Sequence, residues 1–268
     1  MNLRYLLQKK REIIRTVVIS VLLLGIIALL VIGVGSSNNL PPAAPHDYIR
    51  QANLLVLMYH DVSLEPPVDP EHIELVTTGE KLAADIDALL GLNYQPISLE
   101  DYYFGLAEAG QKYFVISFDD GYKGVYDVAY PVLLEKQIPA AVFFNTGMEH
   151  YQAFLHYQDL QELEQSGLFK IYTHLAYHVK ATELPIEEYR RQLDASIEFL
   201  NTYVGEKPMF LAYPYGEHNL DTCLLAREHG IQLQLVQKMH FPAEDILVRV
   251  NVPYNADIKK LVKKAPHN

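Results

Sequence analysis

Two short segments of the sequence carry residue types that bind metal ions and move protons. Residues 117–121 are Ser-Phe-Asp-Asp-Gly, with two adjacent carboxylates after an apolar run, and residues 174–178 are His-Leu-Ala-Tyr-His, with an imidazole at each end. An aspartate and two histidines supply three protein ligands to a divalent metal and leave positions open for water and substrate. The second aspartate is then free to take a proton, so the pattern predicts a hydrolytic site.

Each segment alone has a simpler interpretation. Asp and Gly are turn formers, so Asp-Asp-Gly after a strand also fits an ordinary loop. A histidine near a strand end is more often a hydrogen-bonded core or surface residue than a ligand. Placement of both segments at neighbouring strand ends of one sheet is what a three-ligand site requires, and it favours the metal interpretation.

The elements that must position these residues are short apolar runs alternating with helical patterns. The runs predict strands at 54–59, 113–118, 140–144, 169–172, 210–213, 233–236 and 247–252, and the helical patterns predict helices at 81–90, 125–137, 158–165, 186–203 and 220–229. Such alternation implies an α/β fold of parallel βαβ units, either a barrel or an open doubly wound sheet. In both, ligands bind at the carboxyl ends of the strands, where the two segments fall.

The amino-terminal region predicts a membrane anchor. Residues 16–34 are uncharged and mostly aliphatic, and as a helix they would span roughly 28 Å, close to a bilayer core. Residues 1–15 carry a net charge of +4, which predicts a cytoplasmic amino terminus, one transmembrane helix and an extracellular remainder at the cell membrane. A cleaved signal peptide is the alternative, but the run is long for one and residues 32–36 form a poor cleavage site. A Pro-, Ser- and Asn-rich spacer is predicted at 35–47 and the folded domain at 48–268.

Composition limits the classes of partner. The formal charge of -11 becomes -15 once residues 1–15 are set aside, and so acidic a body argues against nucleic acid. The single cysteine, Cys223, cannot form an internal disulfide and is expected to be a buried thiol. Nothing in the sequence indicates an oligomeric state.

The two segments resemble the motifs of the polysaccharide deacetylases of carbohydrate esterase family 4, also called the NodB-homology domain. That family's Thr-Phe-Asp-Asp-Gly motif corresponds to residues 117–121, and its His-Ser/Thr-x-x-His motif to residues 174–178. The resemblance extends over nearly all of residues 54–252. It implies a distorted (β/α) barrel of the NodB-homology type.

The resemblance also implies the role of each motif residue. Asp120, His174 and His178 would bind one divalent metal, and Asp119 would be the general base that activates a metal-held water. Zinc is the metal we expect first, although cobalt, nickel or manganese also suit this ligand set. The cation would polarise the acetamide carbonyl and stabilise the oxyanion of the tetrahedral intermediate.

A general acid must protonate the leaving amine. In much of the family a histidine of a late motif does this, and His240 is the candidate in that region. Residues 57–62, Leu-Met-Tyr-His-Asp-Val, instead resemble the subgroup that deacetylates poly-β-1,6-N-acetylglucosamine, in which the motif order is circularly permuted. We favour His60 over His240, because a strand-end position brings His60 to the same rim as the metal. Asp61 either orients this imidazole or caps the following turn.

A third motif departs from the family pattern. Residues 213–216, Tyr-Pro-Tyr-Gly, match the family's Arg-x-Pro-x-Gly in part: Pro214 and Gly216 align, whereas Ala212 stands where the arginine would be. That arginine normally helps to hold the catalytic aspartate, so the support of the aspartate is in doubt. Tyr215 is expected to offer its backbone N–H to the oxyanion and its ring to a sugar, unless the segment is only a proline-fixed turn.

Two further positions bear on the site. Leu175 stands where the family has Ser or Thr, and it lacks the hydroxyl that would tie down the histidine loop. Arg249 falls in the last predicted strand, 247–252, where it either serves an acidic partner inside the barrel or is merely solvated.

These features together predict a membrane-anchored, metal-dependent N-deacetylase. Its expected partner is an N-acetylated exopolysaccharide, first of all poly-β-1,6-N-acetylglucosamine, and deacetylation would add positive charge that holds the polymer to a cell surface or biofilm matrix. One alternative is deacetylation of peptidoglycan N-acetylglucosamine with the same residues. Another is a catalytically inactive carbohydrate-binding protein of the cell surface, favoured by the departures at Ala212 and Leu175.

Overall fold

The computed structural model describes residues 53–69 and 73–265. Eight parallel strands form the main sheet in the order β1-β10-β9-β8-β7-β6-β5-β4, and β2 pairs with β3 in a second, small sheet. The strands are β1 (Asn53–Tyr59), β2 (Asp61–Ser63), β3 (Val76–Thr78), β4 (Tyr94–Pro96), β5 (Lys112–Asp120), β6 (Ala140–Phe144), β7 (Phe169–Thr173), β8 (Phe210–Ala212), β9 (Leu233–Val236) and β10 (Ile246–Asn251).

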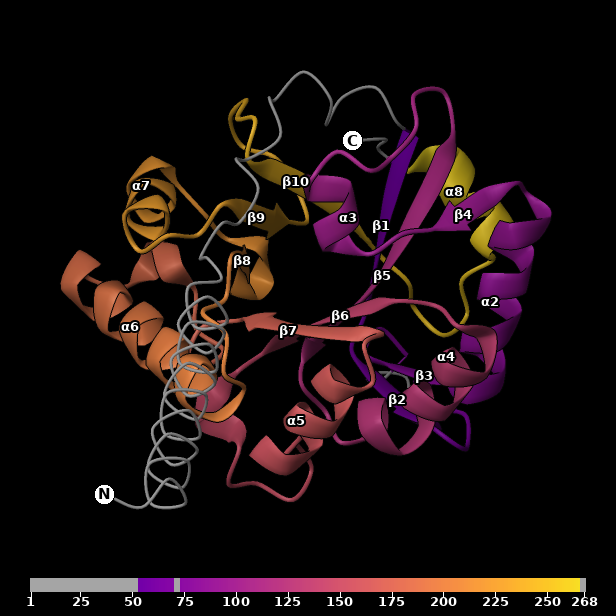
Figure 1. Cartoon of the computed structure of the whole chain (residues 1–268), viewed down its shortest axis with the longest axis horizontal. Coiled ribbons are helices and arrows are strands. Elements are labelled where there is room, and N and C mark those ends of the chain that lie inside the picture. Colours follow the sequence, from indigo (N-terminus) through magenta and orange to yellow (C-terminus); the bar gives the residue numbers. More distant parts are fainter. Residues whose placement is uncertain (1–52, 70–72, 266–268) are drawn as a thin grey trace, which may run out of the picture. The chain divides into compact units, whose positions relative to one another are not determined.

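The main sheet closes on itself. β1 pairs with β5 along its whole length, from Asn53 opposite Lys112 to Tyr59 opposite Phe118, and Figure 1 shows these two strands side by side. On the other edge of β5, β4 pairs with its first residues and β6 with its last. Seven strands therefore make a closed parallel barrel, which confirms the barrel and excludes the open sheet.

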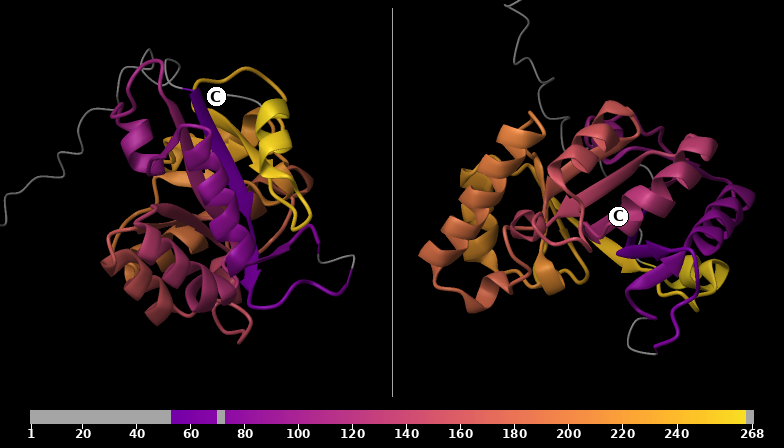
Figure 2. Two further views of the ribbon diagram at one scale, coloured as in Figure 1. Left: turned by 90° about the vertical axis from the view of Figure 1, so that its right-hand side faces the viewer. Right: turned by 90° about the horizontal axis from the view of Figure 1, so that it is seen from below.

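Helices surround the strands, as the two views of Figure 2 show. They are α2 (Gly79–Gly91), α3 (Leu99–Tyr103), α4 (Tyr130–Lys136), α5 (Tyr157–Gln165), α6 (Ile186–Tyr203), α7 (Leu220–Glu228) and α8 (Ile258–Lys264). Local chemistry fixes where several begin: the Thr78 hydroxyl accepts from the Lys81 N–H to cap α2, and the Asn219 side chain accepts from the Thr222 N–H to cap α7. The predicted helix at 125–137 is divided into a π-helical turn (Val125–Ala129) and α4.

The continuous apolar runs of the strands are explained by burial on both faces. In β1, Leu55, Leu57 and Tyr59 pack outward in one core cluster, whereas Leu54 and Val56 belong to a second cluster inside the barrel. The same alternation runs through β5 and β10, where Val115 and Leu247 face the interior. Because successive side chains alternate, Asp119 and Arg249 are also directed into the barrel.

The other predictions about organisation have different outcomes. Cys223 is a buried thiol, as expected. The predicted anchor, 16–34, the spacer, 35–47, and the domain boundary at residue 48 lie outside the described residues. Within the described part of the chain, no helix combines the length and apolarity needed to cross a bilayer.

Candidate metal centre and active site

Three loops meet at the carboxyl end of the barrel, and each holds one non-glycine residue in the left-handed backbone region. These residues are Asp120 at the end of β5, Leu175 after β7 and Tyr215 after β8, with φ of 67°, 66° and 60°. Such conformations cost about 1–3 kcal/mol each and gather at functional sites. Gly121 completes the first loop, because a Cβ there would lie 2.1 Å from the Phe144 ring. The motifs thus supply strained loops that converge at one rim.

A three-residue cluster suited to a metal lies between the first two loops. One ligand atom from each of Asp120, His174 and His178 lies within 4.8 Å of the others. Asp120 Oδ1 is 3.5 Å from Nε2 of both histidines, too far for a hydrogen bond, and this buried oxygen has no hydrogen-bond partner among the described residues. An unpartnered carboxylate oxygen facing two imidazole nitrogens is what a cation would satisfy, so these residues fit a divalent metal.

The tautomer of His174 is set by its second nitrogen. Nδ1 lies 2.7 Å from the carbonyl oxygen of Ala212, and because a carbonyl only accepts, Nδ1 carries the proton. Burial lowers the pKa of His174 to about 3, so the ring is neutral and Nε2 presents its lone pair to the cluster. Ala212 therefore contributes its backbone to the site, although its side chain is not the arginine of the family motif.

Asp119 is held by an arginine from another strand. Nη1 and Nη2 of Arg249 donate to Oδ1 and Oδ2 of Asp119 at 2.5 and 2.6 Å, and both side chains are buried. Burial raises the pKa of Asp119, but the charge and hydrogen bonds of Arg249 outweigh it, with help from His174, and the pKa falls to about 2. Asp119 therefore does not lack support because Ala212 replaces the arginine of the family motif: Arg249 of β10 supplies the guanidinium instead.

Burial acts in the opposite sense on the neighbouring carboxylate. The pKa of Asp120 is raised to about 6, first by burial and also by the negative charge of Asp119, while the charges of His60 and Arg249 lower it. The two adjacent carboxylates thus have pKa values pushed in opposite directions, an arrangement typical of a site that separates their roles.

A cavity of about 510 Å³ joins these groups. Six of its lining residues were singled out in the sequence: His60, Asp119, Asp120, His174, His178 and Tyr215. The other lining residues are Met58, Glu74, Leu75, Tyr122, Asn145, Met148, Phe154, Gln237 and Asn251. Nδ1 of His60 is buried and makes no hydrogen bond to the described residues, so no carboxylate among them accepts from this nitrogen.

Several other candidates lie elsewhere. The ring of His240 packs edge-on against His218, with 4.8 Å between ring centroids, and His240 does not line the cavity. Asp61 Oδ1 accepts from the Val62 N–H at 2.9 Å, within strand β2. Pro214 and Gly216 are buried in the turn that carries Tyr215.

Tyr215 itself lies beside His178 of the three-residue cluster. The residue is 52% exposed, and its ring centroid is 4.3 Å from that of His178. A half-exposed aromatic face beside the cluster is suited to contact a sugar ring.

The histidine loop does not lack a hydroxyl. Thr173 Oγ1 accepts from the Leu175 N–H at 3.0 Å and contacts Ser196 Oγ at 2.7 Å. The Leu175 side chain is fully buried in an apolar cluster beneath the loop. The hydroxyl missing at Leu175 is therefore replaced by that of Thr173, two residues earlier. The family motif does not include this position.

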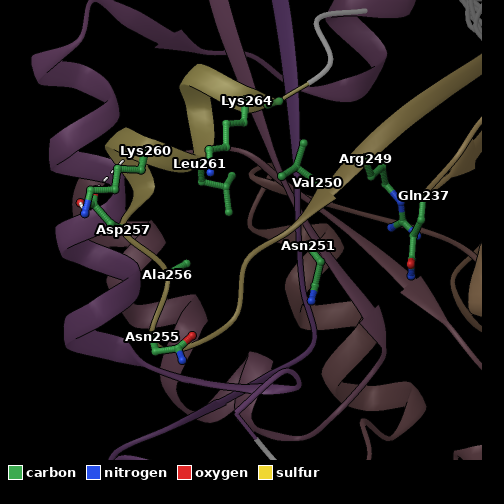
Figure 3. Close-up of a pocket in the computed structure, with 11 residues that line it drawn as sticks. Gln237, Arg249, Val250, Asn251, Asn255, Ala256, Asp257, Lys260, Leu261 and Lys264 are labelled. Carbon is green, nitrogen blue, oxygen red and sulfur yellow. Dashed lines mark hydrogen bonds and ion pairs between the residues drawn. The ribbon is translucent and has the colours of Figure 1, made fainter.

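A second, larger cavity of about 680 Å³ lies beside α8 and contains none of the three cluster residues. Figure 3 shows Arg249 and Gln237 together at one end of it and Lys260, Leu261 and Lys264 of α8 at the other. Volume alone therefore does not identify the site. The smaller cavity does so by its convergent carboxylates and imidazoles.

Comparison with known proteins agrees with this geometry. Residues 107–234 match the family model for polysaccharide deacetylase. The chain is 25% identical over 190 residues to the putative polysaccharide deacetylase YxkH of Bacillus subtilis, covering 69% of this chain and 64% of that protein. It is 28% identical over 130 residues to the poly-beta-1,6-N-acetyl-D-glucosamine N-deacetylase of Staphylococcus aureus, covering 44% of this chain and 45% of that protein. The chain thus spans less than two thirds of the length of either relative.

Solved structures share the fold. The Streptococcus pyogenes deacetylase PplD, in complex with acetate, superposes with a TM-score of 0.69 at 21% identity, covering 79% of this chain and 97% of that one. IcaB from Ammonifex degensii gives a TM-score of 0.61 at 24% identity, covering 76% and 88%. These likenesses show the fold, and the family model identifies a polysaccharide deacetylase domain over residues 107–234.

Proposed function

We propose that the protein is a metal-dependent hydrolase that removes N-acetyl groups from the N-acetylglucosamine units of an extracellular polysaccharide. The observation that carries this proposal is the ionised Asp119, held by Arg249, in one cavity with the cluster of Asp120, His174 and His178. Amide hydrolysis needs an activated water, a stabilised oxyanion and a protonated leaving nitrogen. The cavity holds a candidate for each.

Asp120, His174 and His178 would hold the metal, and zinc suits this ligand set, with cobalt, nickel or manganese as alternatives. When bound, the cation supplies Lewis acidity that polarises the acetamide carbonyl and makes a water more acidic. Left-handed residues at the end of β5 and after β7, Asp120 and Leu175, lie in the segments that bring these ligand atoms within 4.8 Å of one another.

The remaining steps belong to side chains and backbone of this chain. Asp119 takes a proton from the attacking water as its oxygen adds to the carbonyl carbon, and Arg249 keeps the carboxylate ionised and oriented. The Tyr215 N–H donates to the oxyanion. His60 gives a proton to the nitrogen as the carbon–nitrogen bond breaks, which releases acetate and a free amine.

Replacing His60 with glutamine is expected to lower kcat by about 10²- to 10⁴-fold, because the departing amine loses its proton donor. The matched variant His240→Gln removes an imidazole that does not line the cavity, and we expect near-normal turnover. Acetate release should be measured at saturating substrate with the zinc content of each protein determined. A normal rate in His60→Gln together with a slow His240→Gln would move the acid role to His240.

The substrate we favour is poly-β-1,6-N-acetylglucosamine. Support comes from the similarity to the Staphylococcus aureus enzyme and from the half-exposed Tyr215 ring beside the cluster. Peptidoglycan, with β-1,4 linkages, is the alternative substrate. Ala212 and Leu175 no longer favour an inactive binding protein. Arg249 holds Asp119, and the Thr173 hydroxyl accepts a hydrogen bond from the histidine loop.

We further propose that the enzyme works outside the cell, tethered to the membrane. The uncharged run 16–34, the basic residues 1–15 and the spacer 35–47 support a single-pass anchor with a cytoplasmic amino terminus. Deacetylation there would place ammonium groups on a polymer close to an anionic cell surface.

Mass spectrometry of N-acetylglucosamine oligomers, incubated with the zinc-loaded protein, tests the function. Loss of acetyl groups from β-1,6 oligomers, abolished in Asp119→Asn, supports the proposal. Loss only from β-1,4 oligomers would indicate peptidoglycan. No loss from either series, with zinc bound, would contradict the enzymatic function and leave the binding protein.

A further inference from the structure

Asn145 lies between the two loops that carry the metal cluster. It follows β6 directly, and the last residue of β6, Phe144, pairs with Asp120 of β5 on one side and Thr173 of β7 on the other. Asn145 is 1% exposed and lines the 510 Å³ cavity. A buried amide at this junction is in position to affect both loops.

The hydrogen bonds of Asn145 reach both loops. Its backbone N–H donates to the carbonyl of Asp120 at 3.3 Å and is therefore directed toward β5. Its side-chain Nδ2 donates to the carbonyl of His174 on the β7 side. One residue thus ties the loop of the aspartate ligand to the loop of the histidine ligands.

The Asn145 side chain is the first of three successive donors to the histidine loop. The next two residues along the chain, Thr146 and Gly147, donate their backbone N–H groups to the carbonyls of Leu175 and Ala176, at 3.3 and 2.7 Å. With the backbone N–H of Asn145 directed to β5, the His174 carbonyl is left for Nδ2. The amide therefore extends the β6–β7 pairing through the first metal ligand of the histidine loop.

The orientation of the amide is determined by this contact. The His174 carbonyl only accepts, so the nitrogen and not the oxygen of the Asn145 amide must face it. Oδ1 is then left buried and makes no hydrogen bond to the described residues. Burying an unpaired carbonyl oxygen is unfavourable, and an aliphatic side chain of similar size would avoid it. The hydrogen bond from Nδ2 to the His174 carbonyl offsets this penalty.

We propose that Asn145 is a positioning residue that preforms the metal centre. It fixes the His174 backbone relative to Asp120, in a loop whose next residue, Leu175, has an unfavourable positive φ. The two ligands are thereby held facing each other before the metal binds. This inference rests on the metal centre of the proposed function and deepens it.

Zinc affinity tests the inference without reliance on activity. The dissociation constant would be measured by competition with a chromophoric chelator for Asn145→Leu and Asn145→Ala, and we expect it to rise by about 10- to 100-fold, the range typical when a group that orients a ligand is removed. Asn219→Ala is the matched control, since it deletes the same amide from the α7 cap. The control should lower the melting temperature of the zinc-free protein and leave zinc affinity unchanged.

The outcomes separate this inference from the function on which it rests. Weaker zinc binding in both Asn145 variants, with normal binding in the control, supports it. Zinc binding that matches the wild type in both variants overturns it, even if substrate turnover falls, because Asn145 would then act on the substrate. A wild-type protein that binds no zinc overturns both. Having both an aliphatic and a short replacement guards against one variant failing to fold.

Discussion

Asp119→Asn is expected to lower kcat by about 10²- to 10⁴-fold while zinc remains bound, because an amide cannot take the proton of the attacking water. The carboxylate that is lost has a pKa of about 2, so it is ionised throughout the neutral range. It does not belong to the three-residue cluster. Acetate release at saturating substrate, with zinc content determined in the same sample, measures the effect.

Asp120→Asn is the natural comparison, because it replaces the neighbouring carboxylate by the same group. We expect it to weaken zinc binding, since it removes the charged oxygen that faces both imidazoles. Loss of zinc in Asp119→Asn with retention in Asp120→Asn would reverse the two roles. Near-normal turnover of zinc-loaded Asp119→Asn would exclude it as the base.

The barrel and its active rim are predictable because their signals are local. Residues 54–59 and 113–118 are apolar runs too short for helices, and the structure has strands there. The rule that parallel sheets bind ligands at carboxyl strand ends then brings Asp119 and Asp120 next to His174. The strands β2, β3 and β4 were not predicted, because residues 61–63, 76–78 and 94–96 each contain polar residues and form no apolar run. The equally short β8 was predicted, because it lies in the apolar run 210–213.

The support of the base was not predictable from its motif. Arg249 is 130 positions from Asp119, and the two meet only because the barrel closes, with β1 pairing to β10 on one side and to β5 on the other. The sequence left two interpretations of Arg249, an acidic partner inside the barrel or solvation, and alternation in the last strand favours the first, since Leu247 faces the interior and Arg249 shares its parity. An arginine directed into a buried interior requires an acidic partner.

The left-handed conformation of Leu175 was also not predictable from the sequence. A leucine has no intrinsic reason to adopt positive φ, and no local pattern marks it. Tertiary contacts impose it: the Thr173 hydroxyl accepts from its N–H, the Thr146 N–H donates to its carbonyl, and its side chain is fully buried. Strain of this kind is visible only once the neighbouring loops are in place.

Arg249→Leu is expected to destabilise the protein by about 3–5 kcal/mol at neutral pH, because it leaves the buried Asp119 carboxylate without its partner. Urea unfolding measures the loss. The double variant Asp119→Asn/Arg249→Leu removes the charge as well, and we expect it to be more stable than Arg249→Leu alone. Equal stability of Arg249→Leu and the double variant would show that the unpaired Asp119 charge does not cause the loss.

The same substitution should change the pH dependence in a definite direction. In the wild type the pKa of Asp119 falls from its ordinary value of 3.8 to about 2, so the pair contributes stability that is complete above 3.8 and lost as the pH falls through 2. Without Arg249, burial raises the pKa of Asp119 unopposed by its main counter-charge, and the base becomes protonated at higher pH. The acid limb of kcat/KM should therefore move upward in Arg249→Leu and less in Arg249→Lys, which keeps the charge but loses the two-pronged contact. An acid limb that stays in place in Arg249→Leu would mean that another group, and not Asp119, sets the protonation state of the base.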